Sequence, residues 1–316
     1  MIVYGSVSRR LLPCSLVLGL VCASRSAAPV PADLFVVRAV RVFDGERLIP
    51  NASVLVRDGF IAAVGEEVAI PQGAEEIDGA GRTLLPGLID AHGHAHGRAL
   101  REQLVFGVTT VLDMSTDPHW AADMRREQKA GQGLDRADIY SAGTLVTAPH
   151  GHGTEHADIP TITSAAQAQR VVDSRIAEGS DFMKIVYDDG RIFGHPIPSI
   201  DRPTLQGLVA AAHARGRLAV VHIGSLEEAR DALELGADGL AHLTPDGIVD
   251  DSFVALARLR GAFVVPTLSV AESECGISSG ASLVTDTRVA PYLSPFSERN
   301  LGKSFHPGYA RPLALA

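Results

Sequence analysis

The sequence predicts an α/β protein, a (β/α)8 TIM-type barrel that lacks its eighth strand, preceded by a small N-terminal β-layer. From residue 85 onward, short apolar runs alternate with helical stretches. Several of these stretches end on glycine, the residue favoured just beyond a helix C-terminus. The 31 glycines and 18 prolines supply the tight connections that such a fold needs. Continuously apolar strands separated by helices indicate parallel pairing through right-handed crossovers.

Composition and charge limit the function classes. Of the 316 residues, 46% are hydrophobic and 21% charged, which is typical of a globular protein and disfavours disorder or a coiled coil. The formal charge is −9, and no basic run or stripe occurs. Nucleic acid is therefore not expected as a partner.

The N-terminus is typical of a secretory signal peptide over residues 1–28. Arg9 and Arg10 precede an apolar run over 11–23, and small residues follow as far as Ala28. The run is too short to span a bilayer, which takes ~20 residues. A buried N-terminal helix is the alternative, but three prolines in and behind the run disfavour it. We expect a secreted or periplasmic protein with no stable membrane anchor after cleavage.

Residues 33–84 are expected to form the small β-layer. Runs rich in Val and Ile are separated by the turn pairs Asp44-Gly45, Asp58-Gly59 and Asp78-Gly79. Such a pair between two apolar runs predicts a β-hairpin.

Residues 85–316 are expected to form the incomplete barrel. The predicted strands cover 84–92, 108–114, 138–143, 181–187, 217–222, 238–242 and 262–268. The clearest helical stretches cover 164–179, 202–216 and 226–236. No GxGxxG follows the first strand, which disfavours a nucleotide-binding open sheet. No eighth Val/Ile/Leu run follows residue 268, so we expect a C-terminally truncated barrel with two open edges.

Metal-capable side chains lie at the ends of four predicted strands, where this fold places its chemistry. His92 and His94 have i, i+2 spacing, which puts both on one face of the first strand. Lys184 lies near the end of the fourth strand, His222 ends the fifth and His242 the sixth. Each alone could be an ordinary core or surface residue, but their joint placement indicates a metal site, since imidazole is a good Zn²⁺ ligand.

The segments that contain these residues resemble a known family. LLPGLIDAHGH, DFMKIVYDDG, VVHIGSLEEARDALELGADGLAH and VVPTL are similar to the metal-dependent amidohydrolase superfamily, in its imidazolonepropionase and Xaa-Pro dipeptidase (prolidase)-like branch. The resemblance runs from about residue 36 to the end. It implies that the β-layer is half of a composite β-sandwich.

The resemblance also implies a ligand set. His92 and His94 would bind a first metal, and His222 and His242 a second. Lys184, carboxylated by CO₂, would bridge the two. The implied cofactors are two divalent metal ions, with zinc expected.

The family has an Asp at the end of strand eight, which binds the first metal and transfers the proton. No residue here matches it in context. Asp286, in LVTDTR, follows no apolar run and is not expected to take this role.

Two residues are candidates for substrate binding. His152 lies in the loop TAPHGHGTEHAD after the third strand and could bind a carboxylate or carbonyl oxygen; a solvated loop is the alternative. Tyr187 follows Lys184 closely and is expected to offer a hydrogen bond to the pocket. Asp188 and Asp189 are interpreted as turn residues before Gly190.

The leading hypothesis is a hydrolase of C–N bonds in which a metal-bridging hydroxide attacks an amide carbonyl, with dipeptides or cyclic amides as substrates. A phosphotriester or lactone hydrolase would use the same residues. A catalytically impaired fragment without the strand-eight Asp is the third alternative. A homo-oligomer is compatible with the sequence.

Overall fold

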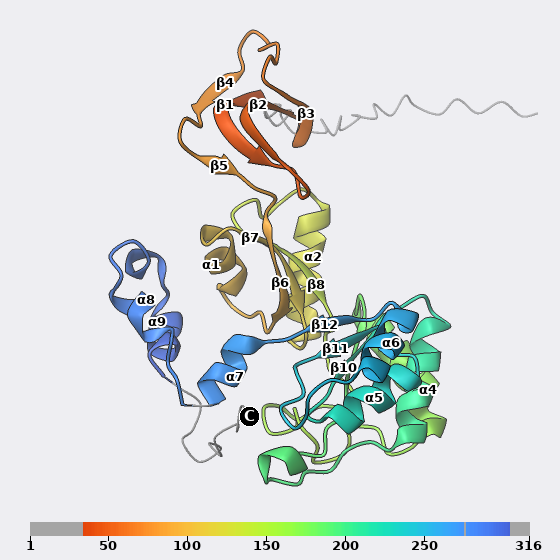
Figure 1. The fold of residues 1–316 in the computed structure, drawn as a ribbon. Helices are drawn as coiled ribbons and strands as arrows, with labels where there is room; N and C mark the ends of the chain where they lie inside the picture. The colour runs from red at the N-terminus through yellow and green to blue at the C-terminus, as the bar shows by residue number, and fades with distance from the viewer. Residues whose placement is uncertain (1–33, 275, 304–316) are drawn as a thin grey trace, which may run out of the picture. The chain divides into compact units, whose positions relative to one another are not determined.

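The computed structural model describes residues 34–274 and 276–303, and the predicted signal peptide lies outside these ranges. The chain divides into two compact units, Met1–Pro86 and Gly87–Ala316 (Figure 1). The sequence places the boundary between residues 84 and 85. Within the described ranges, no helix is long and apolar enough to cross a membrane.

The first unit contains one five-stranded sheet with the order β3-β2-β1-β4, and β5 also pairs with β1. Its strands are β1 (Leu34–Phe43), β2 (Leu48–Arg57), β3 (Phe60–Gly65), β4 (Glu75–Asp78) and β5 (Thr83–Leu84). The small β-layer is therefore present. The composite sandwich is not confirmed, because the described residues of this unit form a single sheet.

Two of the three predicted hairpins are confirmed. β1 and β2 are antiparallel across Asp44-Gly45, and β2 and β3 across Asp58-Gly59. The third prediction is wrong, because β4 and β5 on either side of Asp78-Gly79 both run parallel to β1. The backbone N–H of Gly79 donates to the Arg38 carbonyl at 2.8 Å, which keeps this turn against β1. After this turn the chain therefore continues along β1 in the same direction, and the turn does not form a hairpin.

The second unit contains all seven predicted strands, and all their pairings are parallel. They are β6 (Leu88–Gly93), β7 (Val108–Asp113), β8 (Asp138–Ser141), β9 (Met183–Val186), β10 (Ala219–His222), β11 (Gly239–Ala241) and β12 (Phe263–Val265). They form two sheets, β6-β7-β8 and β9-β10-β11-β12. A bridge between Val146, beyond β8, and Ile185 in β9 connects the two sheets.

The strands of the described residues do not close into a barrel. In the parts of 266–303 that the structure describes, the chain forms helices and no strand. The side chains of Leu88 and Ile89 in β6 are 56% and 64% exposed, and those of Phe263 and Val264 in β12 are 38% and 43% exposed. Both outer strands therefore present apolar surface. The second unit therefore has an α/β fold with parallel sheets.

The α-helices of the described residues are α1 (Ala99–Val105), α2 (Pro118–Lys129), α3 (Ala168–Glu178), α4 (Arg202–His213), α5 (Leu226–Glu234), α6 (Asp251–Arg260), α7 (Leu268–Glu274), α8 (Ala281–Thr285) and α9 (Pro295–Leu301). Helices α3, α4 and α5 confirm the three stretches named from the sequence, whereas α7, α8 and α9, beyond the last strand, were not predicted. Gly179, just after α3, has φ 101°, and Gly236, which follows Leu235 after α5, has φ 97°. Such left-handed conformations cost glycine little, which explains these helix ends.

The largest core cluster orients the site strands. Met183 and Ile185 of β9 and Val221 of β10 are buried at 0–1% exposure, in a cluster with leucines of α4 and α5. Successive side chains of a strand point to opposite faces. Lys184 and His222 therefore face away from this cluster, on the inner side of the sheet.

Helix α5 begins with a capping box that also borders the site. The Ser225 hydroxyl accepts the Glu228 N–H at 3.2 Å, and the Glu228 carboxylate accepts the Ser225 N–H at 2.9 Å. We expect Ser225→Ala to lower the free energy of unfolding by about 1 kcal/mol, because one helix N–H loses its partner. Urea unfolding measures this value. Ser282→Ala, at an exposed serine of α8, is the matched control, and an equal loss in both variants would contradict the cap.

Candidate metal centre

The four predicted histidines come together at the strand ends. His92 lies in β6 and His94 directly after it, while His222 ends β10 and His242 follows β11. The ring centroids of His92 and His242 are 4.7 Å apart, those of His222 and His242 4.3 Å, and those of His92 and His94 5.5 Å. Residues up to 150 positions apart thus form one group. Lys184 lies near it in β9 with 3% exposure.

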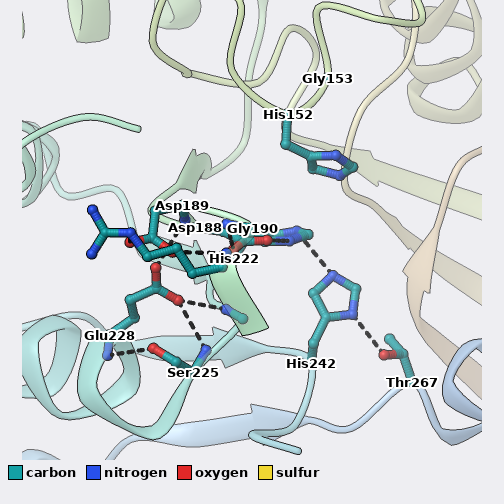
Figure 2. A network of polar contacts seen from close by, with 12 residues as sticks. His152, Gly153, Asp188, Asp189, Gly190, His222, Ser225, Glu228, His242 and Thr267 are labelled. Carbon is teal, nitrogen blue, oxygen red and sulfur yellow. Dashed lines mark hydrogen bonds and ion pairs between the residues drawn. The ribbon is translucent and has the colours of Figure 1, made fainter. Parts of the chain in front are cut away.

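His222 and His242 point one nitrogen each at the other. The distance between His222 Nδ1 and His242 Nε2 is 3.0 Å. Their remaining nitrogens have other partners: His222 Nε2 lies 3.3 Å from the Asp188 carboxylate, and His242 Nδ1 lies 2.7 Å from the Thr267 hydroxyl (Figure 2). Metal-binding histidines have this arrangement, in which the outer nitrogen is held and the inner one faces the ion.

His94 is held in a similar way. Its Nδ1 lies 3.1 Å from the Ser115 carbonyl oxygen. A carbonyl only accepts, so Nδ1 is the protonated nitrogen and Nε2 is the one that can bind a metal. Burial lowers the pKa of His94, which favours the neutral ring.

Two buried nitrogens of the group lack a protein partner. His92 Nδ1 and Lys184 Nζ are both inaccessible to solvent and accept or donate no hydrogen bond within the described residues. Buried polar atoms are normally paired, so such atoms need an explanation. Divalent cations would explain His92 directly, because their ligands are unprotonated nitrogens of this kind. The residues therefore fit a metal site.

The electrostatics favour uncharged ligands. Burial, followed by the nearby Lys184, lowers the pKa of His92 to about 2. Burial and then His222 lower the pKa of His242 to about 2, and the pKa of His222 is well below 6.5 for the same kind of reason. Burial lowers the pKa of Lys184 to about 7. Neutral imidazole is the form that binds metals, so the site is prepared for them at neutral pH.

His152 reaches the site and Tyr187 points elsewhere. The ring of His152 lies 4.7 Å from that of His222 (Figure 2). The His152 Nδ1 lies 2.8 Å from the Glu155 carboxylate. The Tyr187 hydroxyl donates to Asp231 of α5 at 2.9 Å, and burial raises its pKa. Tyr187 packs against the outer core cluster, so the expected pocket contact is not seen. The substrate role of His152 stays a prediction.

Asp286 follows α8 and no strand, as the sequence indicates. Its carboxylate pairs with Arg288 at 2.7 Å.

Two contributors to the site were missed in the sequence. The sequence predicts a turn residue at Asp188, but this residue is only 6% exposed and lies beside His222. Its position directly beyond the Lys184 strand was the available signal, but Asp-Asp-Gly is also ordinary turn composition. No sequence pattern indicates a role for Thr267, because its contact with His242 depends on the positive φ angle of its backbone.

The backbone at His242 and Thr267 is unusual. Their φ angles are 81° and 46°, a region that non-glycine residues seldom adopt. Each such residue costs about 1–3 kcal/mol and persists only where its surroundings hold it. Strain of this kind gathers at functional sites, and here it lies on both partners of one hydrogen bond.

Asp188, Asp189 and Glu228 offer oxygens within 4.8 Å of one another. The Glu228 oxygens already accept three backbone N–H groups, those of Asp189, Gly224 and Ser225, each at 2.9 Å. This acidic cluster therefore holds two loops together.

The fold and this histidine–lysine group define an α/β protein with metal-capable residues at the ends of parallel strands. No family model matches the chain. It is 43% identical to a dihydroorotase of Mycobacterium bovis over 249 residues, which cover 72% of this chain and 52% of that protein. It is 36% identical to an adenine deaminase of Listeria innocua over 97 residues, which cover 29% of this chain and 15% of that protein. The chain spans about half the length of two mycobacterial dihydroorotases that it matches.

Several solved structures share the fold. A Xaa-Pro dipeptidase with bound methionine superposes with a TM-score of 0.63 at 19% identity, covering 86% of this chain and 73% of that one. Aspergillus niger ochratoxinase gives 0.64 at 18% identity, covering 86% and 71%. Phenylurea hydrolase B gives 0.60 at 22% identity, covering 85% and 72%. The sequence similarities to a dihydroorotase and an adenine deaminase support the amidohydrolase superfamily, and the solved structures show a shared fold; the predicted branch is not distinguished.

Proposed function

We propose that this chain contains the site of a metal-dependent amidohydrolase that hydrolyses C–N bonds in small amides, with dipeptides and cyclic amides as the substrate class. The observation that supports this most directly is the pair of converging nitrogens on His222 and His242, with His92 and Lys184 unpartnered beside them. The similarity to dihydroorotases and adenine deaminases supports the same reaction class.

We propose a role for each ligand. His92 and His94 would hold one cation, His222 and His242 the other, and Lys184 would lie between them, with zinc as the cation. Bound there, two divalent cations would polarise a carbonyl group and lower the pKa of a bound water toward ~7. His152 would bind the substrate through the ring edge that Glu155 leaves free.

Lys184 is suited to carboxylation by CO₂. Only the neutral amine has the lone pair that attacks CO₂, and a pKa of about 7 makes a large share of the side chain neutral at physiological pH. The new N–C bond forms as one C=O bond of CO₂ becomes a C–O⁻ single bond and the nitrogen releases one proton. The product is an anionic carbamate, whose two oxygens can each bind a cation.

The proposed compartment is secreted or periplasmic, and it rests on the residues 1–28 alone. The proposed partners are small amides or dipeptides. A homo-oligomer is a further proposal.

The reaction class is tested with a substrate panel. Protein prepared with Zn²⁺ and bicarbonate is offered Xaa-Pro dipeptides, N-acyl amino acids and cyclic amides, and in parallel paraoxon-type phosphotriesters and lactones. We expect turnover of at least one amide, and its loss in Lys184→Ala, with exposed Lys129→Ala as the control. Turnover confined to phosphotriesters or lactones would favour a phosphotriester or lactone hydrolase instead. Amide turnover that survives Lys184→Ala would overturn the proposed site.

A further inference from the structure

Asp188 is a buried carboxylate that the ligand set does not use. Its exposure is 6%, and one oxygen lies 3.3 Å from His222 Nε2. The other oxygen accepts the Gly190 N–H at 2.8 Å. A turn residue normally keeps its carboxylate in water, since burying an anion is costly unless it is paired. Here the pairing is with the outer nitrogen of a predicted metal ligand.

The loop that carries Asp188 is fixed by a second carboxylate. Glu228 of α5 accepts the Asp189 N–H with one oxygen, and the Gly224 and Ser225 N–H groups with the other (Figure 2). It therefore joins the loop after β9 to the loop after β10. His222 ends β10, two residues before Gly224, so the joint sets the position of Asp188 relative to the imidazole.

Gly224 leaves the space that Asp188 occupies. A Cβ atom added at Gly224 would lie 2.5 Å from Asp188 Oδ1 and 2.9 Å from its carboxyl carbon. Both distances are too short for any side chain, so residue 224 must be glycine if the carboxylate is to remain beside His222.

We infer that Asp188 is a positioning residue for His222, kept in place by Glu228 and Gly224; this inference rests on the proposed metal site. The carboxylate accepts the Nε2–H of His222 and so fixes the tautomer in which Nδ1 carries the lone pair. That lone pair faces His242 Nε2, where the second cation would bind.

Asparagine at residue 188 tests this role. It keeps the shape of the side chain but has one acceptor oxygen for two donors, the Gly190 N–H and the His222 Nε2–H. We expect Asp188→Asn to weaken the binding of Co²⁺ to the metal-free protein about 10–100-fold. Binding is measured by titrating the protein with Co²⁺ and recording the visible absorption of the bound ion. Gly224→Ala should act in the same direction while leaving the carboxylate present.

Asp189→Asn is the matched control, because it removes the same charge from the neighbouring residue. The Asp189 carboxylate accepts the Arg191 N–H and pairs with the Arg191 side chain. We expect the Co²⁺ affinity of Asp189→Asn to stay within about threefold of that of the parent. Equal affinities of the parent and Asp188→Asn would overturn the inference.

A second readout separates this inference from the proposed function. Imidazole ¹⁵N shifts of the metal-free protein report the His222 tautomer, with its signals assigned by their loss in His222→Gln. We expect Nε2–H in the parent and in Asp189→Asn, and a shift toward Nδ1–H in Asp188→Asn. An unchanged tautomer would overturn the positioning role. A changed tautomer in a protein that binds no Co²⁺ would uphold it and overturn the metal site.

Discussion

Protein purified from cells grown with Zn²⁺ and bicarbonate is expected to contain about two metal ions per chain. The variant His222→Ala is expected to lose most of them. His222 Nδ1 lies 3.0 Å from His242 Nε2, so its removal leaves His242 without the partner that would share the cation. Lys184→Ala should lower the content of both ions, since this residue is proposed to contact both. Plasma mass spectrometry of the dialysed protein gives the number of ions per chain.

Matched controls exclude a general effect of removing a histidine or a lysine. His119 and Lys129 are exposed residues of α2, so His119→Ala and Lys129→Ala should keep the parent metal content. Circular dichroism shows whether each variant is folded. A parent protein that binds no metal would contradict the proposed site, as would variants at His222 and Lys184 that keep their ions while folded.

The stability of the protein is expected to depend on pH through Asp113, and Asp113→Asn should remove that dependence. Asp113 has 0% exposure; one oxygen accepts the Ala95 N–H at 2.8 Å and the other the Ser141 hydroxyl at 2.6 Å. Burial raises its pKa from 3.8 to about 6, against the opposing effect of these two hydrogen bonds. The protonated form is thus favoured in the folded state.

The sign of the effect follows from the two pKa values. Below pH 3.8 both states are protonated, and Asp113 has no effect on stability. Between pH 3.8 and about 6 the unfolded chain ionises first, so the free energy of unfolding falls as the pH rises. Above pH 6 the free energy of unfolding stays about 3 kcal/mol lower than it is below pH 3.8, as far as Asp113 determines it. Asparagine does not ionise. The free energy of unfolding of Asp113→Asn, relative to that of the parent, should therefore rise by about this amount between pH 4 and 7.

Urea unfolding at several pH values between 4 and 7 measures this difference. The control is Asp123→Asn, because Asp123 is an exposed carboxylate of α2 that pairs with Arg126. Its unfolding free energy should follow the parent curve at a constant offset. If the curve of Asp113→Asn also runs parallel to that of the parent, the raised pKa of Asp113 is disproved.

The strands and the ligand group were predictable from the sequence because both depend on local patterns. An apolar run such as that around Lys184 gives a buried strand, and the C-terminal ends of parallel strands meet at one edge. The same alternation explains Tyr187: it lies two residues beyond Ile185, on the outer face with Met183. That rule, applied to the sequence, would have removed Tyr187 from the pocket.

The remaining features depend on contacts between distant residues. The Asp78-Gly79 turn looks like a hairpin locally, and only the pairing of both flanking strands with β1 shows that it is not. The role of Asp188 depends on Glu228, 40 positions away in the sequence. The Thr267 contact requires a positive φ that a β-branched residue adopts only under tertiary constraint.

The ligand group lies on both sheets of the second unit. His92 lies in the β6-β7-β8 sheet and His94 directly follows β6, while Lys184 and His222 lie in the other sheet and His242 directly follows β11. In the described residues the two sheets are joined by the bridge between Val146 and Ile185 and by a few further hydrogen bonds, such as that from the Asp181 N–H to the Ser141 carbonyl of β8 at 2.8 Å. A cation pair held by all five residues would therefore act as a cross-link between sheets, much as a disulfide does between loops. Folding and catalysis would then depend on the same bonds, and a ligand substitution would change the rigidity of the unit together with its chemistry.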